Sequence, residues 1–486
     1  MYLSILLFSP LIACFIILLL KKKRLIRWMA VVGTTPSLIL SLFLYIFYMR
    51  EGSLQSFSEF RTWIFLGVDQ PFSLPFQLGV DGLSVIMILF TSILAFLSAI
   101  ASVYVKQHVK GFYTLLFILQ FGMLGVFLAD NLFLFFIFLE ITLIPMFFLI
   151  GNWGEGEKRK TSFYYLLYNG LGSLLLLMAF VYLFSKTGTT SISELQKMIP
   201  TLSTVTNVEK TVLFTVFLIG FGIKLPIVPF HSWMIYVHQH APSSIVMLHS
   251  GVLLKIGGYG LITFSLSFFP EQASMASSWL IGLGTINFLY GGFIALAQTN
   301  LRRMIAYSSV SHMGVVLIGI GSIHEIGVQG AVFQMISHGF ITAFFFFLIV
   351  ILEDRRLSLD YNSLSGMSSS MTKLASMFIV CCLASVGLPG MSGFISEFLV
   401  FTGVFNQNLL LGSIAVVGIL VTVIYMVRFI SVVQKGHAKQ PKADLNGLEL
   451  SSALLFVLMI IAIGVFPSVV SSAIAEPIEL LVKGMR

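Results

Sequence analysis

Residues 132–145, Leu132-Phe133-Leu134-Phe135-Phe136-Ile137-Phe138-Leu139-Glu140-Ile141-Thr142-Leu143-Ile144-Pro145, form an apolar run with one charged side chain, Glu140. Three further charges, Lys224, Lys255 and Glu397, lie in stretches of similar character. A charge at the centre of a bilayer costs about 2.5–3.5 kcal/mol, so such residues usually face the interior of a helix bundle or a water-filled path. Two acids and two bases in this setting favour a chain of groups that passes protons. The alternative is a pair of structural ion pairs that fix how the helices align.

The composition places the chain in the membrane. Of its 486 residues 57% are hydrophobic and only 10% are charged, and the mean hydropathy is +0.99. Soluble domains carry about 25% charged residues. The net charge of +8 comes from basic residues in short loops between apolar runs, which is typical of membrane orientation and not of a nucleic-acid surface. Three cysteines lie in apolar runs without metal-ligand spacing, so no metal or cofactor site is expected in this chain.

The apolar runs predict an all-α polytopic fold of about 14 transmembrane helices of roughly 20 residues each. The first precedes the basic residues 21–24, the reverse of a signal peptide, and is interpreted as a retained helix. The long run at 372–403 is interrupted at Gly387-Leu388-Pro389-Gly390 and is interpreted as two half-helices. The predicted spans are 2–20, 28–49, 82–104, 112–129, 131–150, 162–184, 210–229, 243–267, 277–297, 303–322, 327–352, 372–403, 408–433 and 450–470.

The basic residues predict the orientation. Most of the 28 lysines and arginines fall in loops that follow odd-numbered helices, including the loops with Lys21–Arg24, Lys158–Lys160 and Arg302-Arg303. Loops rich in lysine and arginine face the cytoplasm. We therefore expect a multi-pass protein of the cell (plasma) membrane with both termini outside the cytoplasm.

Two predicted helices share an unusual pattern. The seventh ends in Lys224-Leu225-Pro226 and the twelfth contains Gly387-Leu388-Pro389-Gly390 followed by Glu397. Both are interrupted by proline beside a charge, and they lie five helices apart, so they cross the membrane in opposite directions. This favours two inverted five-helix repeats, helices 4–8 (111–270) and 9–13 (271–440), with broken helices at the ion path. Helices 1–3 (1–110) precede the repeats and helix 14 (441–486) follows. The alternative is two ordinary proline kinks.

Six motifs identify a family. They are Gly79-Val80-Asp81-Gly82-Leu83-Ser84; Lys224-Leu225-Pro226 with Pro229-Phe230-His231-Ser232-Trp233; His240-Ala241-Pro242-Ser243-Ser244; Leu254-Lys255-Ile256-Gly257-Gly258-Tyr259-Gly260; residues 297–312, which include Asn300-Leu301-Arg302-Arg303-Met304 and His312; and Leu388-Pro389-Gly390-Met391-Ser392-Gly393-Phe394. Together they resemble the antiporter-like, proton-pumping membrane subunits of NADH:quinone oxidoreductase (complex I). The acid at Glu397 is similar to one chain of that complex, whereas its sister chains and the D subunits of multisubunit cation/proton antiporters typically carry lysine there.

The resemblance implies a role for each buried charge. Glu140 would hold Lys224 protonated through an ion pair, and withdrawal of Glu140 would release that proton. Lys255 would be the central relay and Glu397 the terminal one.

Histidines supply further candidate relays, because imidazole can exchange a proton near neutral pH. His312 and His338 could carry a proton between the two repeats, and His231 is a further candidate. The structural alternative for each is a neutral histidine bonded to a backbone carbonyl.

The resemblance also implies the partners. The chain itself would hold no redox centre, while partner subunits would carry FMN and iron–sulfur clusters and bind NADH and quinone. Its neighbours would be other antiporter-like membrane subunits within the lipid bilayer, with no nucleic acid. Three alternatives stay open: the D-type subunit of a cation/proton antiporter, the membrane subunit of a proton-pumping hydrogenase, and an electron-carrying cytochrome whose histidines ligate haem.

Overall fold

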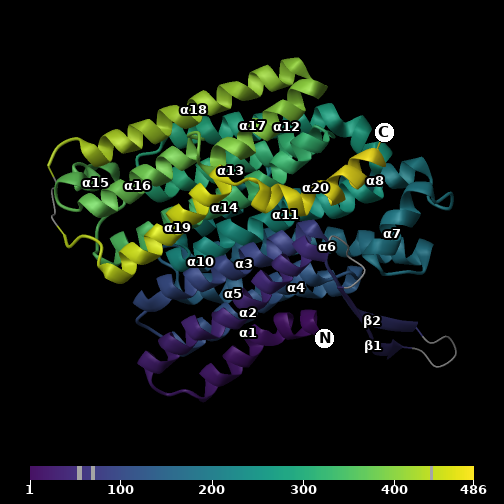
Figure 1. Cartoon of the computed structure of the whole chain (residues 1–486), viewed down its shortest axis with the longest axis horizontal. Coiled ribbons are helices and arrows are strands. Elements are labelled where there is room, and N and C mark those ends of the chain that lie inside the picture. Colours follow the sequence, from purple (N-terminus) through teal and green to yellow (C-terminus); the bar gives the residue numbers. More distant parts are fainter. Residues whose placement is uncertain (52–56, 67–71, 438–441, 486) are drawn as a thin grey trace.

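A computed structural model of the chain describes residues 1–51, 57–66, 72–437 and 442–485. Long helices lie side by side in a bundle, drawn with their axes roughly horizontal (Figure 1). Lys439 and Arg486, two of the basic residues considered for the orientation, lie outside the described residues.

The N-terminal part contains three long helices and a hairpin. The helices are α1 (Tyr2–Leu19), α2 (Lys23–Glu51) and α3 (Gly82–Ala101), which is continued by the 3-10 turn Ser102–Tyr104. Strands β1 (Ser58–Leu66) and β2 (Phe72–Gly79) form an antiparallel hairpin that pairs Ser58 with Gly79. Glu59 ties this hairpin to α1, because its Oε1 accepts the Leu3 backbone N–H at 2.8 Å. The sequence prediction contained no strands, so this hairpin is an addition to the helical fold.

The first five-helix set runs from α4 to the middle of the chain. It comprises α4 (Val109–Leu128), α5 (Leu132–Trp153), α6 (Lys158–Thr187), the pair α8 (Asn207–Lys224) and α9 (Ser232–His240), and one long mixed helix. The mixed helix joins α10 (Ser243–Leu248), π-helical η4 (His249–Leu253), α11 (Leu254–Gly260) and π-helical η5 (Leu261–Leu266). We call Ser243–Leu266 the central helix. Short α7 (Ile192–Met198) and 3-10 η3 (Ile199–Thr201) precede α8.

The second set has the same make-up. It comprises α12 (Pro270–Ala297), α13 (Leu301–Gly321), α14 (Glu325–Asp354), the pair α16 (Thr372–Ser385) and α17 (Ser392–Gln407), and α18 (Leu409–Gln434). Short α15 (Tyr361–Leu364) and 3-10 η6 (Met367–Ser369) precede α16. Two helices close the chain, α19 (Gly447–Val465) and α20 (Ser468–Lys483). The predicted last span therefore ends earlier than expected, and a further helix follows it.

Asparagine side chains fix where several spans begin. Asn131 Oδ1 accepts the N–H groups of Phe133 and Leu134 at 3.0 and 3.1 Å at the start of α5. Asn300 caps α13 and Asn408 caps α18 in the same way. The first N–H groups of a helix have no partner within it, so a side-chain acceptor satisfies them where the chain enters the membrane.

Among the described residues, twelve helices are long and apolar enough to cross a membrane. The two other predicted spans are both interrupted, α8–α9 between Lys224 and Ser232 and α16–α17 between Ser385 and Ser392. Proline removes a backbone donor, and such breaks are tolerated only inside protein or beside water. At the α8–α9 break, freed backbone groups find partners inside the protein. Val228 N–H donates to Asn287 Oδ1 at 2.7 Å, and Ile223 O accepts Trp233 Nε1–H at 3.1 Å.

The two sets pack in the same order. In the first, α4 contacts α5, α5 contacts α6, α6 contacts both α8 and α9, and α8 contacts α11. In the second, α12 contacts α13, α13 contacts α14, α14 contacts both α16 and α17, and α17 contacts α18. Corresponding helices are five spans apart and so cross in opposite directions, which is the arrangement of an inverted repeat with paired broken helices.

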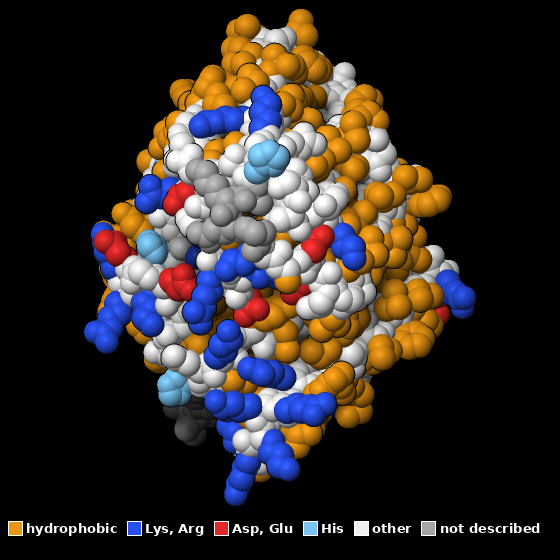
Figure 2. All heavy atoms as spheres, turned by 90° about the vertical axis from the view of Figure 1, so that its left-hand side faces the viewer, with side chains coloured by type: hydrophobic (Ala, Val, Ile, Leu, Met, Phe, Trp, Pro, Cys, Tyr) orange, Lys and Arg blue, Asp and Glu red, His pale blue; other side chains and the backbone are white. Residues whose placement is uncertain are grey.

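Basic side chains gather at one end of the bundle. Figure 2 shows this end, the left-hand side of Figure 1, with many lysines and arginines exposed. They come from the connections after α1, α3, α5, α12, α14 and α18 and from the first turns of the helices that follow. We call it the basic end. Both termini, the hairpin and α7 lie toward the opposite end (Figure 1).

Candidate functional site

Lys224 is the last residue of α8, directly before the break, and its side chain is buried. Its Nζ donates a hydrogen bond to Ser173 Oγ on α6 at 3.2 Å. Helices α6 and α8 approach closely here, because a Cβ on Gly172 would stand 3.1 Å from Gly220 O. The buried ammonium of Lys224 is therefore held by a neutral hydroxyl.

Glu140 lies on α5, which packs against α6 as α8 does. Its carboxylate exerts an electrostatic effect on Lys224, but the two form no ion pair within 4.0 Å. Glu140 Oε1 is buried and lacks a hydrogen-bond partner among the described residues. The direct ion pair predicted from the resemblance is thus not formed in the structure, where the ammonium bonds to Ser173 of α6 instead.

Lys255 lies on α11 within the central helix and is completely buried. Its Nζ donates to Ser250 O and, at 2.9 Å, to Nδ1 of His338 on α14. An ammonium has only donors, so His338 Nδ1 is an acceptor and the ring proton sits on Nε2. His338 Nε2 then donates to Thr342 Oγ1 at 3.0 Å. Lys255 and His338 are therefore in direct contact and can exchange a proton.

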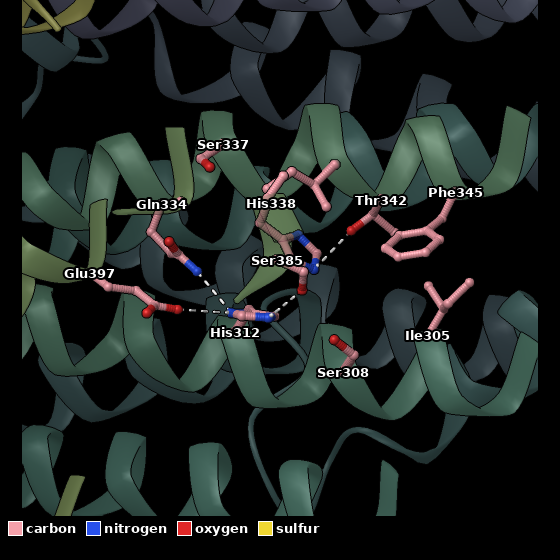
Figure 3. A pocket seen from close by; sticks show the side chains of 13 residues that line it. Ile305, Ser308, His312, Gln334, Ser337, His338, Thr342, Phe345, Ser385 and Glu397 are labelled. Carbon is pink, nitrogen blue, oxygen red and sulfur yellow. Dashed lines mark hydrogen bonds and ion pairs between the residues drawn. The ribbon is translucent and has the colours of Figure 1, made fainter. Parts of the chain in front are cut away.

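His312 on α13 occupies the next position. Its ring centroid is 5.5 Å from that of His338. Gln334 Nε2 donates to His312 Nδ1 at 3.0 Å, and Ser385 Oγ lies 3.3 Å from His312 Nε2. The Gln334 amide orientation is fixed because Ser396 Oγ donates to its oxygen. Figure 3 shows Gln334 and Ser385 pointing toward the His312 ring.

Glu397 on α17 completes the group. Its Oε1 lies 3.7 Å from His312 Nδ1, and the residue is 6% exposed. A small cavity of about 10 Å³ lies among His312, His338 and Glu397 and has room for about one water molecule. Lys255, His338, His312 and Glu397 thus form one string, which we call the relay string. It joins the first five-helix set to the second.

The other histidines lie apart from the relay string. His231 directly precedes α9 and packs edge-on against Tyr290 of α12, with ring centroids 5.2 Å apart. His238 and His249 are fully buried and face each other with centroids 5.3 Å apart. No ring nitrogen of His238 or His249 has a hydrogen-bond partner among the described residues. Sequence reasoning gave these two histidines little weight.

Several polar residues of the site were not predicted. Gln334 is one of them. It lies four residues before the predicted His338 on α14, so the two share a helix face, and this spacing could have identified Gln334 from the sequence. Ser173, Ser385 and Thr342 gave no such signal. Serine and threonine are common in membrane helices and usually bond to their own backbone.

Comparisons with known proteins decide the family. A model of the NADH:quinone oxidoreductase/Mrp antiporter transmembrane family matches residues 129–422. The chain belongs to this family. One relative is NADH-quinone oxidoreductase subunit M of Rickettsia prowazekii, 33% identical over 99% of this chain and 98% of its own.

Two solved structures share the fold. Respiratory complex I from Thermus thermophilus contains a similar chain, with a TM-score of 0.90, 26% identity and complete coverage of both chains. The Mrp complex from a Dietzia species contains another, with a TM-score of 0.83 and 19% identity over 100% of this chain and 99% of that one. The second likeness concerns the fold alone.

Proposed function

We propose that this chain is the M subunit (chain 4) of a respiratory NADH:quinone oxidoreductase and translocates protons. The observation that carries the proposal is the relay string Lys255–His338–His312–Glu397, built from buried ionisable side chains in a chain whose curated relatives are subunit M. Membrane-embedded ionisable residues that contact one another are typical of proton relays. Partner subunits would oxidise NADH with FMN and iron–sulfur clusters and reduce quinone, and neighbouring antiporter-like subunits would flank this chain in the cell membrane.

Proton transfer along the string follows from its geometry. Lys255 can give a proton directly to His338 Nδ1 as His338 Nε2–H passes its own onward. The cavity has room for one water that can carry the proton to His312. Because Nδ1 of neutral His312 accepts from Gln334 Nε2–H, the Gln334 amide must turn away before Nδ1 takes the proton, and the resulting imidazolium then gives its Nδ1–H to Glu397 after a small approach from 3.7 Å. Charge-assisted hydrogen bonds are worth about 1.5–3 kcal/mol. Moving one charge against about 150 mV requires about 3.5 kcal/mol. The free energy of rearranging one or two such hydrogen bonds is therefore comparable to the free energy needed to move one proton across the membrane.

Lys224 and Glu140 would supply the first half of the path. With Ser173 as its one hydrogen-bond partner among the described residues, Lys224 is poised between holding and releasing its proton. A shift of α5 relative to α6 would bring Glu140 closer and favour the charged lysine, and the reverse shift would favour release. We propose that redox events in partner subunits drive this movement.

The decisive experiment removes one link of the string. His338→Gln keeps polarity and approximate size but cannot carry a proton, so proton uptake per NADH oxidised is expected to fall at least about tenfold, the effect of losing a positioned proton donor. The measurement uses the intact complex in inverted membrane vesicles, with complex abundance as the assembly control. Normal pumping with glutamine at 338 contradicts the relay.

The matched control is His240→Gln. His240 lies at the end of α9, its Nδ1 lies 3.1 Å from Glu155 O, and it belongs to neither the relay string nor the break. We expect normal pumping from this variant. Purification of the complex also tests the partners: subunits with FMN and iron–sulfur clusters should accompany this chain.

The proposed orientation has its own test. Arg303 is exposed at the basic end and Lys483 is exposed at the opposite end, whereas Cys14, Cys381 and Cys382 are all buried. We expect Arg303→Cys to react with a membrane-impermeant thiol reagent only after cell lysis and Lys483→Cys to react in intact cells. The opposite labelling pattern contradicts the placement of both termini outside the cytoplasm.

A further inference from the structure

A cavity of about 960 Å³ opens at the basic end, where the connection from α1 to α2 lies beside the connection from α3 to α4. Among the described residues that line it, four are lysines, one is a histidine and none is acidic. These five are Lys21, Lys23, Lys106, His108 and Lys110. We call it the basic cavity. Figure 2 shows lysines and arginines crowded over the lower part of the basic end, where α1 and α2 lie in Figure 1.

Hydrogen bonds between helices and connections hold the walls of the basic cavity. Lys110, in the first turn of α4, donates through Nζ to Leu18 O of α1 at 2.9 Å. Trp153, the last residue of α5, donates its Nε1–H to Gln107 O at 2.9 Å. The partner of Lys110 is a neutral carbonyl, so its positive charge is not balanced by this contact. The cavity is thus a built feature of the fold.

The positive charge of the basic cavity is only partly neutralised. Lys106 Nζ forms an ion pair with Asp354 Oδ1 at 3.3 Å, and both side chains are partly exposed. Lys21 and Lys23 are exposed, and neither has a hydrogen-bond or ion-pair partner among the described residues. Their ammonium groups are therefore free to bind an anion.

Membrane orientation alone does not explain this arrangement. The positive-inside rule requires basic residues in the connections, but it does not require lysines from two connections to share one cavity without an acid. Two other cavities at the basic end, of about 430 and 540 Å³, are both lined by Arg302 together with Glu155 and Glu353. In those cavities carboxylates face the basic side chains, whereas in the basic cavity no lining carboxylate does so among the described residues.

Exposed apolar side chains adjoin the basic cavity. Leu18 and Leu19 at the end of α1 and Leu25 at the start of α2 are each at least half exposed. Trp28, further along α2, is also more than half exposed. Exposed tryptophan is typical of the level of the lipid headgroups. The basic cavity therefore lies at headgroup level, next to a surface on which acyl chains can lie.

We propose that the basic cavity binds the headgroup of an anionic phospholipid, such as phosphatidylglycerol or cardiolipin. Lys21 and Lys23 bind the phosphate from one wall and Lys110 binds it from the other, while the acyl chains lie on Leu19 and Leu25. Basic pockets on the cytoplasmic side of membrane helices are typical sites for such headgroups. Free phosphate has the same charge chemistry, but it has no use for the adjoining apolar surface. The inference goes beyond the proposed function and does not depend on proton translocation.

The test uses the intact complex in vesicles that contain a phosphatidylglycerol with a photoactivatable group near its headgroup. We expect covalent adducts on peptides from residues 18–28 and 105–111, identified by mass spectrometry. Lys21→Gln combined with Lys23→Gln should lower this labelling at least about fivefold, because even one basic residue near anionic lipid strengthens binding by about that factor. Complex abundance shows whether the variant still assembles.

The matched control is Lys22→Gln combined with Arg24→Gln. Both residues are exposed in the same segment, but neither lines the basic cavity, and this variant loses the same charge. It should be labelled like the parent. Lys21→Arg combined with Lys23→Arg keeps the charge and should also be labelled like the parent, because guanidinium binds phosphate well. If the two glutamine pairs lower labelling equally, the lipid responds to general surface charge and the proposal is wrong.

Competition identifies the ligand. Excess unlabelled phosphatidylglycerol should suppress the labelling, whereas phosphatidylcholine at the same fraction and millimolar inorganic phosphate should not. Suppression by phosphate would show an ion site, and equal suppression by phosphatidylcholine would show no preference for a charged headgroup; either result overturns the proposal. Because the readout is labelling and not pumping, its failure leaves the relay string untouched, and a failure of the relay string leaves this site untouched.

Discussion

Replacing Lys224 by arginine is expected to stop proton pumping almost as completely as replacing it by alanine. Lys224 is buried at the end of α8 with Ser173 Oγ as its hydrogen-bond partner. Guanidinium stays protonated at any physiological pH, whereas a buried lysine can release its proton. Proton uptake per NADH oxidised should fall to below about a tenth of the parental value, a loss of at least one factor of ten, or about 1.4 kcal/mol in the coupling step.

Lys210→Arg is the matched control. Lys210 lies on the same helix, is also buried, and donates to Pro200 O at 3.0 Å near the opposite end. A fixed positive charge suffices for that contact, so this variant should pump normally. Glu140→Gln belongs in the same series and should impair pumping strongly, because it removes the charge that acts on Lys224. If Lys224→Arg pumps at the parental ratio, only a permanent charge is required at this position.

The sequence predicted the break in each five-helix set because proline and glycine act locally. Pro226 and Pro229 interrupt α8–α9, and Gly387 adopts a positive φ of 78° in the turn between α16 and α17. A left-handed backbone favours glycine. The hairpin and α20 were not predicted. The hairpin lies outside the predicted spans and α20 lies almost entirely beyond the last one. The prediction rested on the length and hydropathy of apolar runs, so it did not address these segments.

Side-chain contacts between helices were harder to predict. The most apolar 18-residue stretch of α14 is completely buried, and so is the corresponding stretch of the central helix. A helix that is apolar all round has no polar face to show how it is rotated. The sequence therefore identified His338 and Lys255 as candidates without showing that they touch. For the same reason it did not reveal that Lys224 would bond to Ser173 and not to Glu140.

Glu397→Gln is expected to impair pumping clearly while the complex still oxidises NADH at a reduced rate. The carboxylate ends the relay string 3.7 Å from His312 Nδ1 and close to the turn at Gly387, where a Cβ would stand 3.3 Å from Glu397 Oε2. Glutamine fills the same space but can neither accept the proton nor attract it across a low-dielectric gap. Pumping and quinone reductase activity are measured together in reconstituted vesicles, with Glu479→Gln, an acid outside the string, as the control.

Lysine at position 397 separates charge from proton exchange. An acid attracts a proton arriving from His312, whereas an ammonium repels it unless it first releases its own proton. Sister chains of this family typically use lysine there, so Glu397→Lys is expected to keep part of the pumping that Glu397→Gln loses. That ranking, parent above lysine above glutamine, requires an exchangeable proton at this position. If glutamine leaves both pumping and quinone reduction unchanged, Glu397 is a structural acid and the proton leaves the relay string elsewhere.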